Sequence, residues 1–192
     1  MEPVIFQAPS GVTTSADQEN AMDSAPHIRS IFITGLRNAH ALENQALSIM
    51  NRQLERLESY PDVAARLQAH VEETNGQIDR LRTVLESLDE SPSAMKDMGA
   101  SFMGSMASLT HSVAGDEILK NSFANFAFEN YEAASYRSLI AMAKKGGFQS
   151  AIPLLEASLS EEEAMAAWLD QHLPAVTERY LQLSGAGAQA SH

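Results

Sequence analysis

The stretch FAFENYEAASYRSLIAMAKKGG, residues 126–147, decides the fold, because its apolar side chains recur with the period of an α-helix. At 100° per residue, Phe126 and Tyr136 lie within one apolar stripe, and Glu129 occupies the middle of it. Two lysines followed by two glycines end the stretch, as is typical of a helix C-terminus. We therefore predict a helix from residue 116 to residue 145 that carries a glutamate on its apolar side.

Three further segments have the same helical period, and prolines mark where two of them start. Pro26 is predicted to open a helix that ends near residue 58, and Pro61 opens a second helix that ends near residue 88. The last helix is predicted from residue 150 to residue 183, with a kink at Pro174. The four segments are long enough to form two helical hairpins.

The connection between these two hairpins is itself long. It begins at Ser91-Pro92 and continues as a methionine-rich stretch broken by Gly99 and Gly104. We predict one or two short helices here, which connect opposite ends of the molecule. Two hairpins of long helices joined by a long crossover are the arrangement of a ferritin-like four-helix bundle. The predicted fold class is therefore all-α.

The two ends of the chain differ in composition from this body. Residues 1–25 contain prolines, four acids and no lysine or arginine, and we predict a flexible acidic tail. Residues 26–183 form the predicted bundle. Residues 184–192, rich in glycine, alanine and serine, are predicted to be a frayed C-terminal tail.

Composition excludes several classes of function. The net charge is −12, which argues against binding to nucleic acid, because phosphate contacts need clustered lysine and arginine. The absence of cysteine excludes disulfides, thiolate catalysis and iron–sulfur clusters, so any metal must be held by oxygen and imidazole nitrogen. No apolar run approaches the roughly 20 residues of a membrane span, and no signal peptide is recognisable. We expect a cytoplasmic protein without a membrane partner.

Acidic side chains fall where apolar ones are expected on three helices. Glu43, Glu129 and Glu162 each lie at the centre of an apolar stripe. On the remaining helix, His70 lies near the stripe and Glu73 flanks it. One further candidate, Glu132, follows Glu129 by one turn.

Each of these side chains has an ordinary structural interpretation when it is taken alone. A single glutamate on an apolar stripe more often extends to water than binds a ligand, and a lone inward histidine more often forms a hydrogen bond in the core. Together they are harder to explain, because an unpaired buried carboxylate costs several kcal/mol and few basic residues lie on these faces. Two divalent cations would balance about four such charges. His40, one turn before Glu43, is predicted to be structural or to support the site from outside.

The segments LRNAHALENQAL (36–47), HVEETNGQIDRL (70–81), FENYEAASY (128–136) and LSEEEAMAAWL (159–169) resemble the bacterial YciE/YciF-like ferritin-like family, a domain of unknown function. The resemblance covers roughly residues 31–181. It implies a bundle of the ferritin and rubrerythrin type, a homodimer and a stress-associated role.

The sequence departs from the usual di-iron pattern, in which two helices give one glutamate each and two give Glu-x-x-His. The second helix has the reverse order, His70-Val-Glu-Glu73, and the fourth has Met165 where histidine is expected. The third helix supplies Glu129-Asn-Tyr-Glu132 instead. We therefore expect a carboxylate-rich site with at most one or two imidazoles.

Two hypotheses on function follow from these observations. The first is a non-haem di-metal protein that holds two divalent ions, iron or manganese, and reacts with oxygen or peroxide as an oxidoreductase. In it Glu43 and Glu129 are terminal or bridging ligands, and Tyr131 or Tyr136 lies beside them. The second is a metal-free bundle that acts as a scaffold or interaction protein under stress. An iron-storage cage is a weaker third alternative, because nothing in the sequence indicates cage-forming interfaces.

Overall fold

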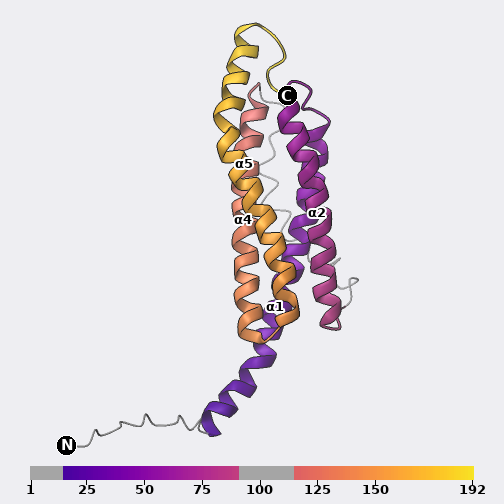
Figure 1. The fold of residues 1–192 in the computed structure, drawn as a ribbon, viewed down its shortest axis with the longest axis vertical. Coiled ribbons are helices and arrows are strands. Elements are labelled where there is room, and N and C mark those ends of the chain that lie inside the picture. Colours follow the sequence, from indigo (N-terminus) through magenta and orange to yellow (C-terminus); the bar gives the residue numbers. More distant parts are fainter. Residues whose placement is uncertain (1–14, 91–114) are drawn as a thin grey trace, which may run out of the picture.

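The protein is a bundle of four long helices in the computed structural model, which describes the backbone of residues 15–90 and 115–192 and the side chains from residue 26 on (Figure 1). The helices are α1 (Ser15–Leu54), α2 (Pro61–Ser87), α4 (Glu117–Gly146) and α5 (Ile152–Gly185), and the short 3-10 helix η3 (Gln149–Ala151) precedes α5. No strand occurs in the described part of the chain. The predicted all-α bundle is confirmed.

The helices form two hairpins that pack side by side. Helix α1 pairs with α2 and α4 pairs with α5, and the hairpins meet through contacts of α1 with α4 and of α2 with α5. Gly147 joins α4 to the second half of its hairpin in a left-handed conformation, with φ of 77°, as the Lys-Lys-Gly-Gly ending predicts. None of the described helices is both long and apolar enough to cross a membrane.

Helix α2 ends and helix α4 begins at opposite ends of the bundle (Figure 1). At one end Arg37 donates a 2.6 Å hydrogen bond to Glu90, just after α2. At the other end the guanidinium of Arg56 binds both carboxylate oxygens of Glu117, at the start of α4. A long crossover is therefore required, as predicted. The short helices expected within it fall on residues 91–114, outside the described part of the chain.

The start of α1 differs from the prediction. The helix begins at Ser15, so that Pro26 lies inside it instead of opening it. Residues 15–25 contain neither glycine nor proline, so nothing in their sequence prevents the helix from extending back from Pro26 to Ser15. The first turns of α1 project beyond the end of the bundle (Figure 1).

The C-terminal end also differs, because it is docked instead of frayed. After Gly187, whose φ is 67°, the chain turns back along the bundle. The carbonyl oxygen of Ser191 accepts a 2.8 Å hydrogen bond from the amide of Ile118, and the hydroxyl of Tyr60 donates to the carbonyl of Ala190 at 2.6 Å. Composition alone does not reveal such long-range backbone pairing.

The apolar core consists of two clusters stacked along the bundle. One surrounds Phe32, Leu81 and Leu155, and the other surrounds Leu67 and Leu169. Burial of each large apolar side chain contributes about 1.5–3 kcal/mol. On α4 and α5 the boundary between the clusters falls at the predicted site residues, and on α1 and α2 those residues lie beside members of the second cluster.

One predicted core residue is on the surface. Phe126 is 37% exposed, whereas Phe128 and Leu139 are buried. At 100° per residue, Phe126 lies about 60° from Glu129 on one side, and Phe128 and Leu139 lie about 80–100° from it on the other. The buried arc of α4 is displaced toward the second side, because Leu139 packs so closely on α1 that a Cβ on Gly35 would lie 2.8 Å from it.

Candidate metal centre

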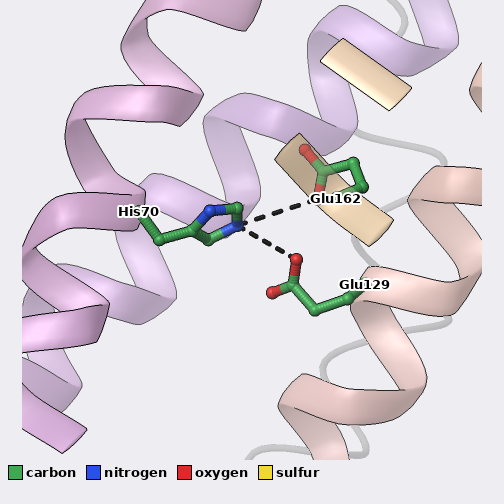
Figure 2. Close-up of side chains that lie close together, drawn as sticks. All are labelled: His70, Glu129 and Glu162. Carbon is green, nitrogen blue, oxygen red and sulfur yellow. Dashed lines mark ion pairs between the residues drawn. The ribbon is translucent and has the colours of Figure 1, made fainter. Parts of the chain in front are cut away.

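Five of the six predicted site residues converge at the boundary between the two apolar clusters. His70, Glu129 and Glu162 each offer one ligand atom, and the three atoms lie within 4.8 Å of one another. Glu43, Glu132 and Glu162 form a second group with the same property. Glu162 belongs to both groups, so the arrangement offers two adjacent positions that share one carboxylate. Figure 2 shows the first group, with the imidazole and the two carboxylates pointing toward one another from three helices.

The cluster is shielded from solvent. Each of its five residues is at most 4% exposed. The reason is local, since every one of them occupies a position at which its helix otherwise places core residues. Four carboxylates therefore lie in an apolar environment, where isolated negative charges are costly.

His70 supplies the positive or neutral nitrogen partner of the cluster. Its Nε2 lies 3.0 Å from Oε2 of Glu129 and 3.7 Å from Oε2 of Glu162, as the dashed lines in Figure 2 show. Its Nδ1 lies 2.7 Å from Oε2 of Glu73. Arg66 donates a 3.0 Å hydrogen bond to the same oxygen of Glu73. The imidazole is thus held from both sides.

Several oxygens of the cluster have no hydrogen-bond partner among the described residues. They are Oε2 of Glu43, Oε1 of Glu132, both oxygens of Glu162, and Oε2 of Glu129, whose contact is the ion pair with His70. Buried polar atoms are normally satisfied, and each exception requires an explanation. Protons or cations are the two ways to compensate these oxygens.

The pKa values of the carboxyl groups reflect burial and mutual repulsion. Burial, opposed by the hydrogen bond from Tyr136 and reinforced by the charge of Glu129, raises the pKa of Glu43 to about 7. Burial and the charges of Glu129 and Glu43 raise the pKa of Glu162 to about 12. The pKa of Glu132 is also raised well above its usual value, by burial and the neighbouring carboxylates. The cluster favours bound protons when no other cation is present.

The imidazole responds in the opposite way. Burial lowers the pKa of His70, but the hydrogen bonds and charges of Glu129 and Glu73 outweigh it and raise the pKa to about 9. A protonated His70 therefore compensates part of the negative charge in the cluster.

The sixth predicted ligand, Glu73, lies outside the cluster. Its side chain is 32% exposed, and it contacts Nδ1 of His70 instead of entering either group. Its pKa is lowered, first by the hydrogen bond with His70 and then by that from Arg66. Glu73 therefore fixes the ring of His70 and leaves Nε2 directed at the other carboxylates, as partners of metal-bound histidines do.

The two tyrosines that were proposed beside the site differ in position. The hydroxyl of Tyr136 donates a 2.6 Å hydrogen bond to Oε1 of Glu43, and the ring is buried. Tyr131 is exposed on the surface of α4. His40 is half-buried, with Nδ1 facing Asn44 of its own helix, and belongs to neither group of ligand atoms.

A polar network beside the cluster was not predicted from the sequence. Arg80 forms an ion pair with Glu161 and donates a 3.0 Å hydrogen bond to Ser158, and Gln77 donates to Glu161 at 3.1 Å. The positive charge of Arg80 also lowers the pKa of Glu43. The spacing of Gln77 and Arg80, three residues apart, places them on one face of α2 and is the signal that predicts it.

The donor set fits a pair of divalent ions. It combines four carboxylates with one imidazole, and neither group of ligand atoms contains sulfur. Met165 is buried one turn after Glu162. Carboxylate and imidazole are the ligands of di-iron and di-manganese bundle proteins. Two ions of charge +2 would balance the four buried carboxylates and satisfy the oxygens that lack hydrogen bonds.

Comparison with known proteins places this architecture among bacterial relatives. The family model described as "Domain of unknown function (DUF892)" matches residues 27–182. Protein YciF of Escherichia coli (strain K12) is 32% identical over 144 residues, which are 71% of this chain and 84% of YciF.

Solved structures agree with this comparison. A protein of Xanthomonas campestris pv. campestris is 30% identical, with a TM-score of 0.69 over 82% of this chain and 99% of that one. The crystal structure of YciF, described as an E. coli stress protein, is 30% identical, with a TM-score of 0.64 over 76% of this chain and 94% of YciF.

Proposed function

The chain belongs to the DUF892 family, and for this member we propose that the buried cluster holds two divalent metal ions, iron or manganese, and reacts with oxygen or peroxide. The identity to YciF and the similarity to its crystal structure confirm the predicted resemblance to YciF-like proteins. The observation that carries the proposal is that two groups of three ligand atoms share Glu162, while its two oxygens lack any hydrogen bond in the described part of the chain.

The residues of the chain have distinct tasks in this proposal. His70, Glu129 and Glu162 would hold one ion, and Glu43, Glu132 and Glu162 would hold the other. A bound metal pair supplies redox equivalents and a Lewis acid for a small oxidant. The protein residues bind the ions, bring them close together and exclude bulk water.

Two further residues would keep the ligands in place. Tyr136 donates its hydroxyl proton toward Glu43 and so stabilises the ionised carboxylate that a cation requires. Glu73 accepts from Nδ1 of His70 and keeps Nε2 available as a ligand atom. Loss of either contact would loosen a ligand without removing it.

We also propose a stress-associated role and a homodimeric assembly. The first rests on YciF, which is described as a stress protein. The second rests on the family resemblance and on helices that are longer than a small monomer needs. Light scattering at micromolar concentration tests it, because twice the monomer mass of 20.8 kDa is expected.

A metal-free scaffold is the second candidate function, and one observation favours it. Protonated His70 already pairs with Glu129 and Glu73, and protons on Glu132 and Glu162 would compensate the remaining charge. In that case the cluster specifies the packing of the bundle and needs no ion.

Metal content separates the two candidates. Protein purified without chelator and without a metal-affinity step should contain close to two equivalents of iron or manganese by mass spectrometry. The variant Glu43→Gln/Glu129→Gln should contain much less. Its matched control, Glu72→Gln/Glu178→Gln, changes two exposed glutamates and should retain the full content. Metal-free wild-type protein that takes up no ion on reconstitution would support the scaffold.

A further inference from the structure

A cavity lies at the end of the bundle where the α1–α2 turn meets the C-terminal half of α5. Its volume is about 290 Å³, near the lower limit of the range of small-molecule sites. It is lined by residues 59–63 and by side chains of α5 between residues 168 and 179. The metal cluster is separate, because the buried Leu67 lies between the cavity and His70 along α2, and the buried Met165 lies between it and Glu162 along α5.

One wall of the cavity is aromatic and held in place. The rings of Trp168 and His172 are stacked, with centroids 4.0 Å apart and planes inclined by 14°. Nδ1 of His172 lies 2.8 Å from the carbonyl oxygen of Trp168 and must carry the proton of that hydrogen bond. Tyr60, which also lines the cavity, is fixed by its bond to Ala190. A preformed wall reduces the ordering cost of binding.

Two opposite charges line the same cavity without neutralising each other. Arg179 and Asp62 are both exposed, and neither forms an ion pair with any residue that the structure describes. Seven other arginines do form such pairs: Arg29, Arg37, Arg56, Arg66, Arg80, Arg82 and Arg137. Within the described residues, only Arg52 shares this property with Arg179. The cavity thus combines an apolar wall, a guanidinium and a carboxylate.

We propose that this cavity binds a small zwitterion with an apolar side chain, of the class of the free aromatic amino acids. The carboxylate of the ligand pairs with Arg179, its ammonium group pairs with Asp62, and its side chain packs against Trp168. A ligand with only a negative charge would leave the carboxylate of Asp62 without a partner. A ligand with only a positive charge would leave the guanidinium of Arg179 without a partner. A zwitterion satisfies both groups at once.

The only tryptophan of the chain reports directly on this cavity. Its fluorescence, excited where phenylalanine does not absorb, should change saturably when L-phenylalanine is added. Two analogues share the aromatic body but carry one charge each, namely 3-phenylpropanoate and 2-phenylethylamine. Each should bind at least about fivefold more weakly than L-phenylalanine. The absence of a saturable change, or equal affinity for all three compounds, overturns the proposal.

Two exposed substitutions assign the charges separately. Arg179→Gln should weaken the binding of L-phenylalanine and 3-phenylpropanoate and leave that of 2-phenylethylamine unchanged or stronger. Asp62→Asn should weaken the binding of L-phenylalanine and 2-phenylethylamine and leave that of 3-phenylpropanoate unchanged or stronger. Arg52→Gln, which removes the other unpaired arginine and does not change the cavity lining, is the matched control and should bind like wild type. If Arg179→Gln affects all three ligands equally, or none of them, the assignment is wrong.

The inference does not depend on the metal centre. The variant Glu43→Gln/Glu129→Gln should bind L-phenylalanine with wild-type affinity, whether or not it binds metal. Melting temperatures of the surface variants within a few degrees of wild type would show that altered binding reflects the cavity and not unfolding.

Discussion

Nδ1 of His70 lies 2.7 Å from Oε2 of Glu73, so that a partly exposed carboxylate fixes an almost fully buried imidazole. The two residues are three positions apart on α2, so their side chains lie on the same face of the helix. Its effect is to make Nε2 of His70 the nitrogen that faces Glu129 and Glu162.

Glu73→Gln tests whether this pair supports a metal. A glutamine keeps the shape of the side chain but removes its charge, so it orients the imidazole less firmly. Affinity for Mn(II) or Fe(II) should fall by about 10- to 100-fold, while the stoichiometry stays the same. Competition with a chelator of known affinity measures the change. Glu72→Gln, at the neighbouring exposed position, should leave the affinity unaltered, and an equal loss in both variants would contradict this role of Glu73.

Thermal denaturation tests the cluster itself. A saturating divalent ion that binds only the folded state should raise the melting temperature of the wild type by about 5–10 °C at 100-fold excess over Kd. Glu43→Gln/Glu129→Gln should lose this rise and yet, without metal, be as stable as wild type or more so, because two like charges leave the core. Strong destabilisation of that variant, together with a wild type that ignores metal, would show that the glutamates are structural hydrogen-bonding groups.

The metal-free protein should lose stability as the pH rises from 5 to 9. Glu43, with a pKa of about 7, and His70, with a pKa of about 9, both bind protons more tightly in the folded state than in the unfolded state. Their contributions are fully present below the unfolded values of about 4.5 and 6.5 and disappear through pH 7 and pH 9. Urea denaturation in the presence of chelator, at a series of pH values, measures this trend.

Added Mn(II) should reverse part of that trend. Ligands must release their protons to bind an ion, so the gain in melting temperature from metal should grow between pH 5 and pH 8. A gain that does not change with pH would mean that the ion binds elsewhere than at the protonated cluster.

The docked C-terminal segment should contribute measurably to stability. Tyr60→Phe removes the hydroxyl that binds the carbonyl of Ala190 and should cost about 1–2 kcal/mol, or roughly 2–8 °C in melting temperature. Tyr180→Phe is the control, because the Tyr180 hydroxyl has no hydrogen bond within the described residues. Equal effects of the two substitutions would argue against the docking.

Helical periodicity predicts the cluster well because burial is a matter of angle around each helix. Glu43, Glu129 and Glu162 lie on the apolar faces of three helices, and the bundle brings any such residues together when their heights match. Periodicity does not decide between His70 and Glu73, which are three residues apart on one face. That choice depends on how deeply α2 packs against α5.

Other features depend on the register between helices, which no single segment contains. The ion pair of Arg80 with Glu161 requires α2 and α5 to be aligned to within about one turn. The exposure of Phe126 follows from the rotation of α4 toward α1, and the start of α1 at Ser15 reflects the absence of any local stop signal. The tail and body boundaries proposed from composition remain predictions where the structure describes no residues.

The sharing of Glu162 by both ligand groups has a topological consequence. The α1–α2 hairpin contains Glu43 and His70 of the cluster, and the α4–α5 hairpin contains Glu129, Glu132 and Glu162. Each of the two ligand groups therefore takes one residue from the first hairpin and two from the second. Each ion would therefore act as a cross-link between two halves that the polypeptide joins only through the connection after Glu90. A cut in that connection would leave the two halves joined by the ions in addition to their packing, so removing the ions should weaken their association.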